Sequence, residues 1–468
     1  MPPTWSNPLP ASTAPLPHGG SLPTLGQWWE QLHDPLLVEL IFASESVSPT
    51  VASAGARIAE ARATRVSAGA ALIPNLNGQL SASRGNSPTS GFTGTTGTTG
   101  TEGVSTSLPI LTTGQAALQS SWEIDLFGGL RANRDASQAR LAGADAKWHD
   151  ARVSVAAETA NTYLGERACR RQLAVSASDA QSRAETARLT DLSMRAGFTA
   201  PADAALARAS AAEASGRLTQ QRAQCAVLEQ ALVSLTGIEA PVLKAKLEAA
   251  PIDVALPAVQ AVHSVPAEAL AQRPDVYAAE LGVAAASADA GAALAQRLPR
   301  LTLQGSIAAV QVRTSGFHET FDTWTIGPLA LNLPIFDGGT LAANEAAAKV
   351  RYDEAVSQYR ASVRQAVREV EEALINLRST DERAEDADTA VTNYQASFDA
   401  TQARFSTGLA SLFDLEDARR TLFVSQTSRV SLQRERAEAW VALYRAMGGG
   451  WSRPESIATT APAAAPSP

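Results

Sequence analysis

Apolar or small side chains alternate with polar ones along residues 76–83 and again along residues 116–125. An alternation with a period of two is typical of a β-strand that has one apolar and one polar face. A second pair of such segments covers residues 301–307 and 321–333, and Pro328 predicts a β-bulge in the last of them. The pattern therefore predicts four strands, arranged in two pairs.

Each strand pair contains a predicted loop. A run rich in Gly, Thr and Ser extends from Gly85 to about Ser107, which predicts a long flexible loop between the first two strands. A short loop near Ser315 and Gly316 joins the second two.

Long runs without proline follow both strand pairs, at residues 129–195 and 339–407. A helix of about 68 residues spans roughly 100 Å at its rise of 1.5 Å per residue, which is far longer than an ordinary helix. Gly197 and Gly408 mark turns after which a return helix begins, so each run predicts a long helical hairpin. In the second run one apolar or small residue recurs at every seventh position, which favours supercoiling against a partner helix: Val356, Val363, Val370, Leu377, Ala384, Val391, Phe398 and Phe405.

The two halves of the chain are related by internal duplication. Residues 126–129, Leu-Phe-Gly-Gly, correspond to residues 335–339, Ile-Phe-Asp-Gly-Gly, and both precede an alanine-rich run. At a common offset of 211 positions, three residues of the first half match three of the second: Gly197, Asp203 and Arg208 match Gly408, Asp414 and Arg419. Each half is therefore predicted to hold one strand pair followed by one helical hairpin.

Other segments carry weaker signals. Prolines in residues 238–265 predict an irregular connector, and a further helix is expected from Pro266 to Gln296. The tail after Arg453 is rich in Ala, Pro, Ser and Thr and is expected to be disordered.

Composition and charge exclude several classes of protein. Aromatic residues make up 5% of the 468 residues and charged residues 18%, which favours closely packed helices over a large aromatic core. The net charge of -8 lacks the basic surface that a nucleic-acid-binding protein needs. The sequence contains no run of about 18 apolar residues, so it predicts no transmembrane helix. The first residues do not resemble a signal peptide, so we expect any export signal to lie outside this chain.

Motifs for catalysis or cofactor binding are absent from the sequence. The five histidines show neither HxxxH nor HExxH spacing, and no glycine-rich phosphate-binding motif follows a predicted strand. No nucleophile elbow is present. We therefore expect no enzymatic activity, no metal site and no cofactor.

Four strands are too few to close a membrane barrel, because transmembrane barrels contain eight or more and leave no open edge in lipid. Several chains must therefore contribute strands to a common barrel. In such a barrel we expect one set of side chains to face lipid and the alternating set to face the lumen, although packing in a soluble sheet is an alternative. The lipid-facing set is Leu118, Trp122, Leu301, Leu303 and Ile307, and the lumen-facing set is Gln119, Ser121, Thr302 and Gln304.

Five short segments, in this order, resemble the TolC-like outer-membrane factors, particularly the NodT/OprM-type channels of resistance-nodulation-division efflux pumps. The resemblance covers about residues 27–450. The segments are Trp28-Trp29-Glu30 with Asp34-Pro35-Leu36, Ala56-Arg57-Ile58-Ala59-Glu60-Ala61-Arg62, Glu123-Ile124-Asp125-Leu126-Phe127-Gly128, Arg273-Pro274-Asp275-Val276, and Pro334-Ile335-Phe336-Asp337-Gly338-Gly339.

This resemblance implies a mainly α protein with β structure. Four strands from each chain of a homotrimer would form a 12-stranded outer-membrane β-barrel, continued by a long α-helical coiled-coil tunnel in the periplasm. It also implies contact with outer-membrane lipid and docking to a periplasmic adaptor protein and an inner-membrane resistance-nodulation-division pump. The implied function is a passive exit duct for small molecules, gated at the periplasmic helical tip. Members often begin with a lipidated cysteine, and this chain has no cysteine before Cys169.

The resemblance also divides the chain into seven segments. They are an N-terminal segment with a helix of the equatorial region (1–72), the first barrel strand pair (73–126), the first long hairpin (127–237), an equatorial connector and helix (238–297), the second strand pair (298–335), the second long hairpin (336–449) and a disordered tail (450–468).

Two other functions stay open from the sequence. A soluble or surface coiled-coil scaffold would explain the helices but not the matching strand pairs. A secreted or surface adhesin would explain the Gly/Thr loop but not the duplication.

The predicted gate lies at the second hairpin tip, where residues 405–417 resemble the periplasmic-aperture segment of TolC. Asp414 and Asp417 match its paired aspartates, and threefold symmetry would place six carboxylates around the pore, which favours cations. Phe405 replaces a gate tyrosine and Ala410 an arginine. Asp203, the counterpart of Asp414 in the first half, is expected to add a second acidic ring. The alternative is that these carboxylates only stabilise the start of the return helix.

Cys169 and Cys225 are the two cysteines of the chain, and each lies 28 residues from the turn glycine Gly197. Equal distances from the turn place two residues side by side in an antiparallel hairpin. We therefore predict a disulfide between them in an exported protein, with two buried free thiols as the alternative.

Overall fold

The computed structural model describes residues 28–30, 32–86, 110–252, 272–314, 317–451 and 453. Four of the sequence predictions lie wholly or mostly outside these residues: the Gly/Thr/Ser loop after Gly85, the loop at Ser315 and Gly316, the start of the helix expected from Pro266, and the tail after Arg453. The chain divides into two compact units, Met1–Ile58 with Gly143–Glu280 and Gln358–Pro468, and Ala59–Ala142 with Leu281–Ser357.

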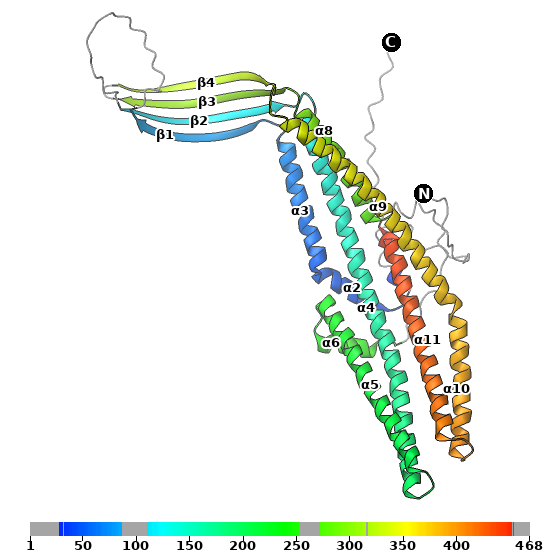
Figure 1. Cartoon of the computed structure of the whole chain (residues 1–468). Coiled ribbons are helices and arrows are strands. Elements are labelled where there is room, and N and C mark those ends of the chain that lie inside the picture. The colour runs from blue at the N-terminus through cyan, green and yellow to red at the C-terminus, as the bar shows by residue number, and fades with distance from the viewer. Residues whose placement is uncertain are drawn as a thin grey trace, which may run out of the picture. The chain divides into compact units, whose positions relative to one another are not determined.

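The second unit contains one antiparallel sheet with the strand order β1-β2-β3-β4 (Figure 1). Its strands are β1 (Asn75–Gly85), β2 (Leu111–Ile124), β3 (Arg300–Thr314) and β4 (Phe317–Asn332). The prediction of four strands in two pairs is confirmed. β2 begins at Leu111 rather than at residue 116, because β1 and β3 both pair with its first residues although these lack a clear apolar alternation.

The register separates the two predicted sets of side chains onto opposite faces of the sheet. Leu118 lies opposite Ile307, and Trp122 lies opposite Leu303, so the apolar set shares one face. Ser121 lies opposite Gln304 on the other face. The separation into two faces is thus confirmed, whereas the environment of each face stays a prediction.

The predicted bulge at Pro328 is also confirmed. Gly305 pairs with Ile326 and Leu303 pairs with Leu329, so Gly327 and Pro328 together lie opposite a single residue of β3. The extra residue keeps Ile326 and Leu329 on the same face, although strict alternation would separate them. The bulge therefore extends the apolar face along β4.

Helices account for most of the remaining described residues. They are α2 (Pro35–Val47), α3 (Pro49–Ala70), α4 (Gly129–Arg195), α5 (Pro201–Thr236), α6 (Ala240–Ala249), α8 (Pro274–Ala295), α9 (Thr340–Glu382), α10 (Ala384–Ser406), α11 (Leu412–Ala446) and the short 3₁₀ helix η1 (Gly448–Gly450). Gly197 and Gly408 adopt φ angles of 80° and 79° at the two predicted turns. Both helical hairpins are confirmed (Figure 1).

Three predictions about helix boundaries were wrong. Residues 35–70 form two helices rather than one, because Ser48 is extended and Pro49 has no N–H to continue α2. The connector after Gly237 contains α6, since Pro241 lies in the first helical turn, where its missing N–H costs nothing, and Leu243 and Leu247 are buried. The second proline-free run is broken at Arg383, although its N–H still bonds to the Ser379 carbonyl.

The helix predicted from Pro266 starts at Pro274 within the described residues. No single described helix combines the length and apolar character that a membrane crossing requires, whereas two bent helix pairs meet these criteria only when each pair is taken together.

Aromatic rings hold the centre of the first unit together. Trp28 lies 4.8 Å from Trp440 and Trp29 lies 4.5 Å from Tyr444, measured between ring centroids. Asp34 caps α2 by accepting from the Leu36 N–H, and it also accepts a hydrogen bond from the Tyr163 hydroxyl. The N-terminal residues are thereby fixed to α4 and α11.

The seven-residue stripe forms the inner line of α9 and α10. Four of its members are buried, namely Val370, Leu377, Val391 and Phe398, and the other four are half-buried. The prediction that this stripe packs against a partner helix is confirmed at Phe398, which contacts Leu415 and Leu422 of α11, whereas the supercoil stays a prediction.

The end of α11 is fixed by a close approach of two backbones. Gly448 has a φ of 80°, and a Cβ built there would lie 2.1 Å from the Gln272 carbonyl oxygen. Any side chain at this position therefore has to push the two segments apart, and it would also be strained by the left-handed backbone.

Gly448→Ala is expected to destabilise the protein by about 2–4 kcal/mol through overpacking and backbone strain. Circular dichroism during heating should show a lower unfolding midpoint. Gly216→Ala is the matched control: a Cβ there meets no atom within 4 Å inside α5, so this variant should be unchanged or stabilised by up to about 1 kcal/mol. Equal midpoints for both variants would contradict the prediction.

Candidate functional site

The tip of the second hairpin is closed by backbone hydrogen bonds. The Leu409 N–H donates to the Arg404 carbonyl over 2.8 Å, and the Gly408 N–H donates to the Phe405 carbonyl over 3.0 Å. These bonds satisfy carbonyls at the end of α10. Leu409 and Phe413 remain 72% and 71% exposed, so the tip presents apolar side chains to its surroundings.

Asp414 forms a capping box with Ser411 at the start of α11. The Ser411 hydroxyl accepts from the Asp414 N–H over 3.1 Å, and the Asp414 carboxylate accepts from the Ser411 N–H over 2.9 Å. The hydrogen bonds from Ser411 lower the pKa of Asp414, so this exposed carboxylate is charged at neutral pH. The helix-start role that the sequence left as an alternative is therefore present for Asp414.

Asp417 lies one turn further along α11. It is exposed and forms an ion pair with Arg420, which is also exposed. Leu415 and Arg419, which lie on another face of this part of α11, are buried. Asp414 and Asp417 therefore share the face of α11 that points away from the hairpin core, as their i, i+3 spacing predicts.

Phe405 and Asp203 occupy different surroundings. Phe405 is half-buried and packs against Leu412 and Leu415, so its ring belongs to the core of the tip. Asp203 is exposed in the first turn of α5, where Ala200 provides no side-chain cap. Asp203, Asp414 and Asp417 are thus exposed carboxylates near the two tips, whereas Phe405 is not an exposed gate residue.

A buried charged network, which the sequence analysis did not identify, joins the two hairpins. The Arg183 guanidinium of α4 donates to Asp179 over 2.8 Å and to the Ser210 hydroxyl of α5 over 2.5 Å, and it forms an ion pair with Glu416 of α11. The Ser210 hydroxyl also donates to Glu416 over 2.7 Å. Three helices thus meet at one carboxylate.

Arg419 completes this network. It donates to Glu416 over 2.6 Å and to the Thr186 hydroxyl over 2.9 Å. Burial lowers the pKa of the Arg419 guanidinium, and the neighbouring Glu416 carboxylate opposes that shift. The available sequence signal was Glu416 and Arg419 at i, i+3 spacing beside the two aspartates, but their partners on α4 and α5 lie more than 200 positions away.

Cys169 of α4 and Cys225 of α5 are joined as a disulfide, with their Cα atoms 5.6 Å apart. Both residues are buried, and the Gln221 side chain donates to the Cys169 sulfur over 3.1 Å. The link lies within the first hairpin, well away from its turn at Gly197.

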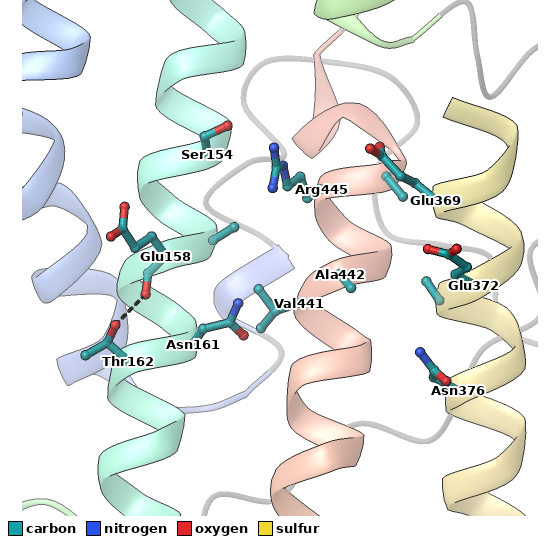
Figure 2. A pocket seen from close by; sticks show the side chains of 13 residues that line it. Ser154, Glu158, Asn161, Thr162, Glu369, Glu372, Asn376, Val441, Ala442 and Arg445 are labelled. Carbon is teal, nitrogen blue, oxygen red and sulfur yellow. Dashed lines mark hydrogen bonds between the residues drawn. The ribbon is translucent and has the colours of Figure 1, made fainter. Parts of the chain in front are cut away.

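A polar cavity of about 590 Å³ lies between α4, α9 and α11 (Figure 2). Figure 2 shows Glu158 and Asn161 on α4, Glu369 and Glu372 on α9, and Arg445 on α11. The Thr162 hydroxyl donates to the Glu158 backbone carbonyl over 2.8 Å and is engaged there. In the part of the chain that the structure describes, no three His, Cys, Asp or Glu side chains are grouped to hold a metal ion.

The chain is similar to known outer-membrane proteins over most of its length. The family model for outer membrane efflux proteins matches residues 41–238 and 265–449. The pyoverdine export outer membrane protein OpmQ of Pseudomonas putida is 30% identical over 451 residues, which cover 96% of this chain and 91% of that protein.

Two solved structures share the fold. The VceC outer membrane protein of Vibrio cholerae has a TM-score of 0.77 at 25% identity, covering 91% of this chain and 99% of VceC. The CmeC outer membrane channel of Campylobacter jejuni has a TM-score of 0.81 at 22% identity, covering 91% of this chain and 88% of CmeC.

Unreduced protein digested with trypsin should yield the peptides of Cys169 and Cys225 as one cross-linked species in a mass spectrum. We expect that species to disappear after reduction, because the two Cα atoms lie within the range for a disulfide. A digest of carefully unreduced protein that contains both peptides separately, each with a free thiol, would contradict the pairing.

Proposed function

The chain belongs to the outer membrane efflux protein family, and we propose that it acts as the passive exit duct of a tripartite efflux pump, gated at the periplasmic helical tips. As a member of this family it is an outer-membrane channel that extends into the periplasm. Family membership over most of the chain disfavours the scaffold and adhesin alternatives. The proposed cargo is small molecules, since OpmQ, a relative at 30% identity, is named for pyoverdine export.

The exposed apolar face of the sheet is the observation that carries this proposal. Eight large apolar residues on it are at least half exposed in the single chain. Such a face is costly in water and favourable against hydrocarbon. Strands of 11 to 16 residues are also long enough for a tilted crossing of the bilayer. The eight are Leu76, Leu80, Leu118, Ile307, Trp324, Ile326, Leu329 and Leu331.

The same sheet supports the proposal of a homotrimer. Each chain supplies four strands, whereas membrane barrels need at least eight, and three copies would supply twelve. We therefore propose a homotrimer in contact with outer-membrane lipid. A periplasmic adaptor and an inner-membrane resistance-nodulation-division pump are the proposed partners at the helical tips.

The proposed gate consists of the exposed carboxylates of Asp414 and Asp417. Three copies would place six of them around the pore, where they attract cations and repel anions. Asp414 would serve both the helix cap and the ring, and Asp203 is proposed to contribute a weaker second ring. Phe405 would act indirectly, by keeping the tip packed.

Purified protein in a planar bilayer should form cation-selective pores, and replacing both Asp414 and Asp417 with Asn should lower the cation-to-anion permeability ratio several-fold. Asn removes the charge but keeps an oxygen that can accept from Ser411. Asp386→Asn, which removes one exposed charge in the first turn of α10, is the control and should change the ratio little. Unchanged selectivity in intact trimers would limit both aspartates to structural roles, and the absence of any pore would contradict the proposed channel.

Cysteine labelling tests which face of the sheet meets lipid. Single cysteines at Thr302 and Gln304 should react with a membrane-impermeant maleimide in proteoliposomes, because these positions are proposed to face the aqueous lumen. Cysteines at Leu301 and Leu303 should be protected by lipid, and all four variants carry Cys169→Ser and Cys225→Ser so that no other thiol reacts. Strong labelling at 301 and 303 with protection at 302 and 304 would reverse the assignment.

A further inference from the structure

The structure contains one junction between the two halves of the chain, in the unit that holds the sheet. There β3 pairs with β2, and α8 lies against α4. A Cβ built on Gly129 would lie 2.9 Å from the Cβ of Ala295, so the two helices approach closely where they leave the sheet. Ala292, Ala295 and Pro299 share a small cavity of about 150 Å³ with Leu126 and Phe127.

The internal duplication repeats both sides of this junction elsewhere in the chain. α8 and β3 correspond to α3 and β1, because both helices have 22 residues and are followed at the same distance by a proline and a strand. Ala295, Pro299 and Arg300 thus correspond to Ala70, Pro74 and Asn75, each 225 positions earlier. On the other side, Leu126 and Phe127 correspond to Ile335 and Phe336.

The corresponding surfaces differ in how well they are covered. Leu126 and Phe127 are 53% and 49% exposed beside α8, whereas Ile335 and Phe336 are 90% and 91% exposed. Likewise Leu298 is half-buried, whereas its counterpart Ile73 is 63% exposed. The same sequence features are thus partly covered at the junction within the chain and more exposed at the two outer edges.

We propose that a second copy of this chain packs its α3–β1 edge against the β4–α9 edge of the first, in a register that repeats the junction between β2 and β3. The two exposed apolar edges then cover each other at least as far as Leu126 and Phe127 are covered within the chain. This inference rests on the proposed trimeric channel and adds the residues and the register of its subunit contact.

The internal duplication defines the register between β4 of one copy and β1 of the next. Within the chain Glu123 lies opposite Thr302. Asn332 corresponds to Glu123, because each lies four residues before its phenylalanine, Phe336 or Phe127. Asn77 corresponds to Thr302, because each lies two residues after the first residue of its strand, Asn75 or Arg300. Asn332 of one copy should therefore lie opposite Asn77 of the next.

The pattern of faces agrees with this register. In the neighbouring pair Leu331 would lie opposite Gly78, and both belong to the apolar face in the chain as described. A slip by one residue would place Leu331 opposite Asn77 and break the apolar face at the subunit boundary. Only registers that differ by an even number of residues avoid this mismatch, and the repeat selects one of them.

Cross-linking of paired cysteines tests the register. Asn77→Cys combined with Asn332→Cys should form intersubunit disulfides in membranes, seen as two-chain and three-chain bands on a non-reducing gel and lost on reduction. A disulfide within one chain is excluded, because these residues lie on opposite edges of a four-stranded sheet, about 14 Å apart at its strand spacing. Cys169 and Cys225 stay paired with each other.

Ser81→Cys with Asn332→Cys is the matched control. Ser81 lies on the same face as Asn77 but four residues further along β1, about 13 Å away, so this pair should cross-link at least tenfold less. Equal cross-linking of both pairs, or cross-linking of the control alone, would overturn the register while pores persist. If neither trimers nor pores form, the proposed function falls and this inference falls with it.

A second measurement tests the apolar contact independently of disulfide chemistry. Phe336→Ser should lower the temperature at which the trimer dissociates on a detergent gel, because it removes an apolar side chain from the proposed contact. Phe198→Ser is the control, since Phe198 is 86% exposed at the tip of the first hairpin. Equal dissociation temperatures for these two variants would overturn the role given to Phe336.

Discussion

A sheet that places one apolar face in lipid cannot leave its outer strands unpaired, because no water is present there to satisfy their N–H and carbonyl groups. Among the described residues, β1 and β4 each have a strand neighbour on one side only. Each unpaired backbone group would cost several kcal/mol in hydrocarbon. In the proposed membrane channel, neither the apolar face nor the open edges suit an isolated chain, which favours pairing with further copies.

In the helical part of the molecule, a polar network joins the two long hairpins. Glu416 links the two hairpins, because Arg183 of α4 and Ser210 of α5 both bond to it, and Arg419 holds its carboxylate from α11 itself. Loss of one partner from such a buried cluster leaves an uncompensated charge and typically costs about 3–5 kcal/mol.

The sequence predicted features that depend on local pattern and failed where distant contacts decide. The strand pairs, the bulge at Pro328 and the turn at Gly408 follow from alternation, proline chemistry and glycine. The prolines of residues 238–265 predict an irregular connector, but Pro241 lies in the first turn of α6, where a proline is compatible with a helix. The network around Glu416 could not be predicted, since its partners come from separate helices and no periodicity links them.

Equivalent positions of a duplicated chain need not keep equivalent roles. Asp203 and Asp414 occupy matching places at the starts of α5 and α11, yet only Asp414 forms a capping box. In the first half the N-cap residue is Ala200, whose side chain cannot accept a hydrogen bond, so the reciprocal pair with Asp203 does not form. The second half has Ser411 instead, and its helix start depends on Asp414. A residue's role therefore follows from its neighbours at each tip.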